Sequence, residues 1–312
     1  MRTSIVRQRR RRGFSLPELL ISMVMISIIG VVLTRLVVTQ SRFSNKQILQ
    51  RNARGVSRGA LTIMESELRA VEQGTAFKGY TGVAVPVPTT SAIVVNVPWA
   101  VGVRCGVNLV AVLPVDTIQQ AIGVSTTSLG NATGTVGVGV MNGATQRYDY
   151  DPTPSAAHGT TIDVAACQAN GINVSGANAM PQLKVVRLSA NMSTGTIGTP
   201  VMLFYRVRYH FDNSTSVPGR RALFRTVASS GAAFGTPEEL VAPFDTSAGF
   251  RFYVGNNRMP TATPVTDSAG LENITGIELR LNAQSERNTQ GRTAPETSNY
   301  RTSIFFRNRR DP

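Results

Sequence analysis

A run of about 20 mostly apolar residues, 19–38, lies near the start of the chain. At about 1.5 Å per residue, a helix of this length spans about 30 Å, which is the thickness of one hydrocarbon core. Arg35 lies near the far end of the run, where its long side chain can reach the membrane interface. The pattern therefore predicts a membrane-spanning helix within residues 14–38.

Residues 39–73 are polar as a whole, but their apolar positions recur at spacings of three and four. This period is typical of one buried face of a helix, and no proline interrupts the chain between Glu18 and Gly74. We expect a single helix of about 55 residues, roughly 80 Å long, that continues through residues 39–73. Its amphipathic half should pack on a head domain through Leu49, Ala53, Val56, Ala60, Met64, Leu68 and Val71.

The composition changes at Gly74, after which segments rich in Val, Thr, Gly and Pro contain short alternating runs. The clearest run, 203–211, has apolar and aromatic side chains on one side and Arg206, Arg208 and His210 on the other. Residues 74–312 are therefore predicted to form a β-rich head, and the fold class is α+β, with an antiparallel sheet packed on the second half of the helix. We expect strands near residues 92–97, 107–113, 184–188, 203–211, 221–226, 276–282 and 300–309.

Residues 123–179 differ from the rest of the predicted head because they are low in charge and dense in Gly, Ser, Thr, Asn and Ala. We expect a loop-rich insertion between strands in this region. The glycines of GVGVMNG at 137–143 do not have the spacing of a phosphate-binding loop or a dinucleotide fingerprint. We interpret them as loop residues.

The chain is strongly basic, with 32 Lys and Arg residues against 18 Asp and Glu residues. Six of the arginines lie among the first twelve residues, before the apolar run, which predicts a cytoplasmic N-terminus and a head outside. A basic excess permits contact with DNA, anionic lipid or acidic proteins and selects none of them. Cys105 and Cys167 are in no metal-ligand spacing; they can form a disulfide if the head is exported and are buried thiols if it is cytosolic.

Three ordinary interpretations of the N-terminal segment leave some of its residues unexplained. A secretory signal ends in a small-residue cleavage site, and none follows the apolar run. Residues 11–14, RRGF, have the shape of a twin-arginine export signal, but that signal also needs a later cleavage site. A plain signal anchor fits the hydropathy and gives no reason for Gly13, Phe14 or Glu18.

The sequence GFSLPE at 13–18, with a basic leader before it and an apolar helix after it, resembles the class III prepilin signal of type IV pilins and type II secretion pseudopilins. The resemblance implies that a prepilin peptidase removes the leader, residues 1–13, by cutting between Gly13 and Phe14, and that Phe14 is then methylated. It also implies that Glu18 pairs with the N-terminal amine of a neighbouring subunit, because a carboxylate in apolar surroundings needs a partner. The expected location is the bacterial inner membrane and then a filament.

A second, more diffuse resemblance concerns the head. The order of LFYRV, LFR, IELRL and a closing FRNR is similar to PilW-like minor pilins and J-type minor pseudopilins. It implies a minor pilin that primes assembly at the filament tip, with other minor and major pilins or pseudopilins as partners. The alternatives are a minor pseudopilin of a type II secretion system and a tip pilin that binds DNA. The DNA contacts would come from Arg301, Arg307, Arg309 and Arg310, with Arg206, Arg208 and Arg280 on the same sheet face.

The sequence does not favour an enzyme. His158 and His210 belong to no HExxH motif, and the GxSxG at 55–59 lies inside the predicted helix rather than on a strand-to-helix turn. We expect no catalytic residues, no metal site and no cofactor.

Overall fold

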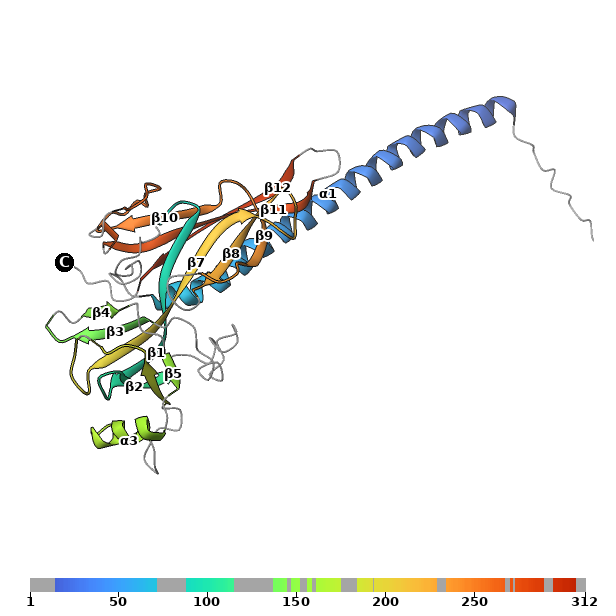
Figure 1. The fold of residues 1–312 in the computed structure, drawn as a ribbon. Coiled ribbons are helices and arrows are strands. Elements are labelled where there is room, and N and C mark those ends of the chain that lie inside the picture. Colours follow the sequence, from blue (N-terminus) through green and yellow to red (C-terminus); the bar gives the residue numbers. More distant parts are fainter. Residues whose placement is uncertain are drawn as a thin grey trace, which may run out of the picture.

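The computed structural model contains a long N-terminal helix and a large antiparallel sheet, which confirms the α+β class (Figure 1). Helix α1, Leu16–Ala70, is one continuous helix of 55 residues. Its first half projects away from the sheet and its second half lies on it (Figure 1). The structure describes residues 15–71, 88–114, 137–144, 147–151, 156–158, 161–174, 184–192, 194–228, 234–266, 270–271, 273–288 and 294–306.

The beginning of α1 is set by residues that are readable in the sequence. Ser15 is the N-cap, Pro17 lies in the first turn, and Glu18 completes a capping box with Ser15. The helix ends at Ala70, and the Val71 N–H bonds to the Leu68 carbonyl at 3.3 Å. The second half buries one face through Ala53, Ser57, Ala60, Met64, Glu67 and Leu68.

Twelve strands form one sheet in the described part of the chain, and every pairing is antiparallel. The main order is β10-β11-β9-β8-β7-β1-β2-β6-β5; β12 pairs with β11, and β3 pairs with β7 and β4. The strands are β1 (Ala92–Arg104), β2 (Leu109–Pro114), β3 (Gly137–Asn142), β4 (Arg147–Asp151), β5 (Ala156–His158), β6 (Lys184–Leu188), β7 (Pro200–Asn213), β8 (Arg221–Val227), β9 (Glu238–Phe244), β10 (Gly249–Val254), β11 (Ile274–Asn288) and β12 (Pro295–Phe305).

The main core lies between the second half of α1 and the inner face of the sheet. The alternating apolar side chains of β7 belong to it, as their period of two predicts. Aromatic side chains fill its centre, where the Phe211 ring lies 5.3 Å from the rings of both Phe244 and Phe250. The apolar residues of α1 that enter this core are Ala53, Ala60, Met64 and Leu68, followed by Val71.

Part of the segment expected to be loop-rich, 123–179, forms regular structure. It contains β3, β4, β5 and the helix α3, Thr161–Ala169. The glycines of β3 that we interpreted as loop residues are strand residues, because the Phe204 ring on the neighbouring β7 packs against the bare backbone of Gly137. A Cβ on Gly137 would overlap that ring. Residues 123–136 lie outside the described part of the chain.

Candidate functional site

The carboxylate of Glu18 lies at the positive end of the α1 dipole. The Ser15 N–H donates to Glu18 Oε2 at 3.4 Å, and the Glu18 N–H donates to the Ser15 carbonyl at 3.0 Å. The carboxylate therefore turns back toward the residue that precedes the helix, where unpaired backbone N–H groups favour a negative charge. Gly13 and Phe14, the two residues on either side of the expected cut, lie outside the described residues.

The first half of α1 is apolar, and residues 16–45 are exposed among the residues that the structure describes. The large apolar side chains of residues 16–38 are exposed, and an 18-residue window of the helix has a mean hydropathy of 2.4. Within the described residues, α1 is the one helix long and apolar enough to cross a membrane. Four hydroxyl groups of this half are satisfied within the helix, where each donates to a carbonyl four residues earlier at 2.8 Å: Ser22, Ser27, Thr34 and Thr39.

The second half of α1 is fixed on the sheet by a buried polar cluster that we did not identify from the sequence. The Arg225 guanidinium on β8 donates to Glu67 Oε1 at 2.7 Å and to Oε2 at 3.4 Å. Tyr205 on β7 donates to Glu67 Oε1 at 3.3 Å, and Tyr209 donates to Oε2. The Glu67 side chain is 1% exposed, so these four groups satisfy one another away from water.

The electrostatics of this cluster hold Arg225 charged and the two tyrosines neutral. Burial, followed by the Glu67 charge, raises the pKa of Tyr205 and of Tyr209 well above the ordinary value. Burial acts to lower the pKa of Arg225, but the adjacent Glu67 carboxylate more than compensates, and the net change is upward. A sequence signal existed: Glu67 lies on the apolar face of α1, next to Leu68 and three residues after Met64, where a carboxylate needs a buried partner.

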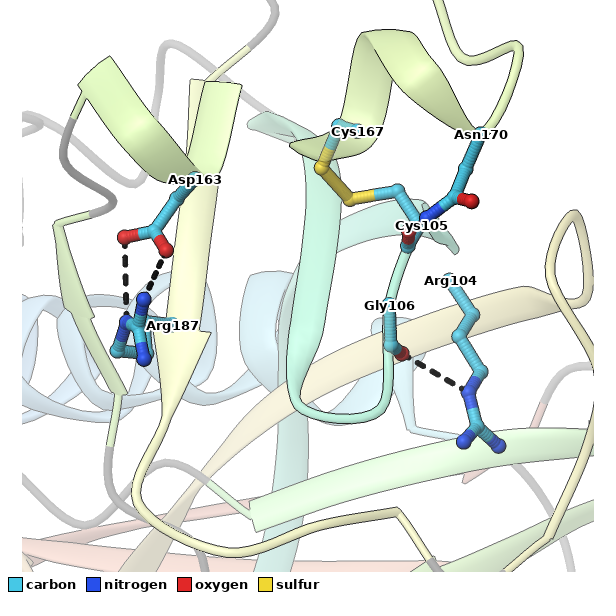
Figure 2. Close-up of a disulfide and its surroundings, with 7 residues drawn as sticks. All are labelled: Arg104, Cys105, Gly106, Asp163, Cys167, Asn170 and Arg187. Atoms are coloured by element: carbon cyan, nitrogen blue, oxygen red, sulfur yellow. Dashed lines mark hydrogen bonds and ion pairs between the residues drawn. A yellow bond between two sulfur atoms is a disulfide. The ribbon is translucent and has the colours of Figure 1, made fainter. Parts of the chain in front are cut away.

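A disulfide joins Cys105, at the end of β1, to Cys167 on α3 (Figure 2). The two Cα atoms are 4.8 Å apart, and the residues are 62 positions apart in the chain. Around the disulfide, the Asn170 side chain donates to the Cys105 carbonyl at 2.8 Å, and Arg187 on β6 forms an ion pair with Asp163 on α3. These contacts fasten α3 to the β2–β6 end of the sheet over a small apolar cluster of its own.

The expected basic residues of β7, β11 and β12 alternate with core residues and so lie on the opposite face of the sheet, but they do not form one cluster. Arg206 is buried, 3% exposed, while Arg208 is exposed on β7. Arg280 on β11 lies directly across from Arg301 on β12, but β8 and β9 separate β11 from β7. Arg307, Arg309 and Arg310 lie outside the described residues.

His210 lies on β7 beside Phe224 of β8. Its ring stacks on Phe224 with centroids 5.3 Å apart, and burial, followed by the charge of Arg208, lowers its pKa. Across the described ranges, no three or more His, Cys, Asp and Glu side chains are grouped as metal ligands.

Comparison with known proteins places the candidate site at the N-terminus. Residues 8–34 match the family model for the prokaryotic N-terminal methylation motif. No curated protein and no solved structure matches the chain. The motif and the exposed apolar helix that contains most of it support the type IV pilin-like class for this protein, that is, a type IV pilin or a pseudopilin-like protein.

Proposed function

We propose that this protein is a minor type IV pilin of the PilW-like kind, which primes filament assembly and lies at the filament tip. The observation that carries the proposal is the methylation motif at residues 8–34, placed directly on the apolar first half of α1, whose large apolar side chains are exposed. An exposed apolar helix of this length must be covered by lipid or by other helices. Lipid covers the helix while the protein is in the membrane, and the helices of other subunits cover it in the filament core.

The maturation step follows from the motif. A prepilin peptidase cuts between Gly13 and Phe14, and the new N-terminal amine of Phe14 becomes methylated. The cut removes the basic leader and leaves the apolar run, so the helix stays in the inner membrane. The basic leader orients the chain before the cut, with the N-terminus at the cytoplasmic side and the head outside.

Glu18 then takes the central role in assembly. Its carboxylate already turns toward the start of the helix, where it accepts a hydrogen bond from the Ser15 N–H. The α-amine of a neighbouring subunit can meet this carboxylate as the two apolar helices pack side by side. Pairing neutralises both charges in apolar surroundings, so the subunit can leave the membrane for the filament core.

The head acts in this proposal by position and not by catalysis, and it needs no metal or cofactor. The Glu67 cluster fixes the head to α1, so the placement of the helix in the filament also sets the placement of the head. A minor pseudopilin of a type II secretion system would use the same helix and the same cut. The filament with which the mature protein co-purifies separates the two systems.

The test is the N-terminal mass of the protein recovered from membranes, with and without a co-expressed prepilin peptidase. We expect a peptide that begins at methylated Phe14 only when the peptidase is present. Glu18→Gln should still be cut but should be depleted from the filament fraction, whereas Glu65→Gln, at a half-buried carboxylate of the same helix, should be retained. An intact Met1, or a cut beyond Val38, would contradict the proposal.

A further inference from the structure

Strand β12 forms a long open edge of the sheet. Within the described residues, it pairs with β11 and with no other strand. The ends of the main path are less open, because β5 is three residues long and β10 is bridged by Thr261 through Phe252. Along β12 the exposed side chains are Thr297, Asn299, Tyr300, Arg301, Ser303 and Phe305.

The ladder shows which backbone groups of β12 point outward. The Phe306 N–H donates to the Thr275 carbonyl at 3.0 Å, so the residues of β12 that bond to β11 are the even-numbered ones. The N–H and C=O groups of Arg301, Ser303 and Phe305 therefore point away from β11. An edge with free groups of this kind can pair with a further strand.

The side chains on this edge combine a cation with an aromatic ring. Arg301 is exposed, and no carboxylate in the described part of the chain forms an ion pair with it. Its cross-strand neighbour Arg280 pairs with Glu278 at 3.4 Å. Four residues further along the same face, Phe305 is 49% exposed and lies against Tyr253, with ring centroids 4.9 Å apart.

A second cation reaches the same edge from α1. A surface hollow of about 340 Å³ is lined by Arg69, Ser303, Ile304 and Phe305. The Arg69 side chain is 65% exposed and forms an ion pair with Glu65 one turn earlier. A surface ion pair of this kind contributes little free energy. An acidic side chain placed in the hollow can therefore compete for Arg69.

We propose that the β12 edge binds an extended, acidic segment of a partner protein as an added antiparallel or parallel strand. An acidic side chain of the segment lies beside Arg301, and an apolar side chain four residues away packs on Phe305. A second copy of this chain fits poorly, because it brings the same cations and a basic net charge to the edge. The proposal goes beyond the filament role and does not require it.

The test uses the full chain in detergent and a fluorescent peptide of about nine residues, a usual strand length. The peptide has a Thr/Val background with Glu and Phe on one face, four positions apart. One control peptide has Lys in place of Glu, and a second has Pro at its centre to remove backbone pairing. We expect the acidic peptide to bind and both controls to lose binding.

The matched protein variants are Ser303→Pro and Ser303→Ala. Both remove the hydroxyl that lies 2.8 Å from the Tyr253 hydroxyl, but only Ser303→Pro removes the outward N–H, and it leaves the bonds to β11 intact. We expect Ser303→Pro to weaken binding by about tenfold or more and Ser303→Ala to leave it unchanged. Arg301→Glu should weaken binding of the acidic peptide by about fivefold and strengthen that of the Lys peptide.

Three outcomes would overturn the proposal. The first is acidic-peptide binding that is absent, or that survives both Ser303→Pro and Arg301→Glu. The second is self-association of the chain that Ser303→Pro abolishes, which would make the occupant a second copy. The third is a single-stranded DNA oligomer that binds more tightly than the peptide and is insensitive to Ser303→Pro, which would make this face a phosphate-binding surface. Protection of amides 299–305 from hydrogen exchange by the acidic peptide would support the added strand even if a variant fails to fold.

Discussion

The Glu67 carboxylate of α1 and the Arg225 guanidinium of β8 meet at 2.7 Å, with side chains 1% and 7% exposed. The two residues are 158 positions apart in the chain. Tyr205 and Tyr209 complete the coordination of the carboxylate from β7. Only one rotation and one axial position of α1 place Glu67 beneath all three donors, so the pair fixes where the head lies along the helix.

Replacing Glu67 should destabilise the docked head strongly. Glu67→Gln leaves Arg225 charged and buried without its counterion, and breaking a buried pair from one side typically costs about 3–5 kcal/mol. The control is Glu65→Gln, which breaks the surface pair with Arg69 and should cost less than about 1 kcal/mol. The measurement is the free energy of unfolding by urea in detergent. Equal losses for the two variants would show that the cluster does not hold the head.

A double variant separates the buried charge from the loss of packing. Glu67→Gln combined with Arg225→Met removes both charges, and the unpaired guanidinium is no longer present. We expect the double variant to be more stable than Glu67→Gln alone, because replacing a whole buried pair is often nearly neutral. A further loss of stability in the double variant would contradict this explanation.

The dependence of the unfolding free energy on pH should include a contribution from the Glu239 carboxylate on β9. This carboxylate accepts hydrogen bonds from the Ser214 hydroxyl and from the Thr215 N–H, both at 2.7 Å, and so closes the turn between β7 and β8. Burial acts to raise its pKa, but the hydrogen bonds from Ser216, Thr215 and Ser214 outweigh burial and lower it to about 2. The folded pKa lies below the ordinary 4.5, so the stabilisation is complete above about 4.5 and is lost as the pH falls toward 2.

Glu239→Gln should therefore flatten the dependence of the unfolding free energy on pH in this acidic window. Glu238→Gln, at the adjacent exposed position, should retain the slope of the unaltered protein. Urea denaturation at a series of pH values between about 2 and 5 measures both. An unchanged slope in Glu239→Gln would remove this carboxylate as the cause.

The disulfide between Cys105 and Cys167 should protect the α3 region against local opening. A cross-link over 62 residues removes unfolded-state entropy worth about 4 kcal/mol in the chain-entropy model. Reduction should make the chain near Asn170 sensitive to protease before the main core opens. Cys105→Ala with Cys167→Ala should show the same sensitivity with and without reductant. Protection that persists after reduction would assign the fastening to the ion pair of Asp163 with Arg187 instead.

Gly137→Ala should destabilise the contact between β3 and β7, because the added methyl group overlaps the Phe204 ring. Overpacking of this kind typically costs about 1–3 kcal/mol. The matched control is Gly143→Ala at the β3–β4 turn, where nothing lies within 4 Å of an added Cβ. The two variants are compared by thermal unfolding, and equal effects would rule out the overlap as the cause.

Local patterns in the sequence predicted the long helix α1 and strand β7 of this protein. The period of three and four along residues 39–73 corresponds to the helix face that the sheet covers, and the alternation in 203–211 corresponds to strand β7. The position of Glu18 is also readable, because Ser15 three residues earlier completes a capping box. These features depend on neighbours within one helical turn or one strand, so the geometry of a single element determines them.

The contacts that join the elements were decided by tertiary structure. The sequence marks Glu67 as an unusual residue on an apolar face, but it does not name Arg225, Tyr205 and Tyr209 as its partners. The glycines of β3 looked like loop residues because nothing local indicates that the Phe204 ring needs the space above Gly137. The open β12 edge is likewise a consequence of strand order. The motif, the apolar helix and the strand periods were therefore determined by the sequence alone. The docking of the helix, the β3 strand and the open edge were decided by the tertiary structure, because each depends on groups far apart in the chain.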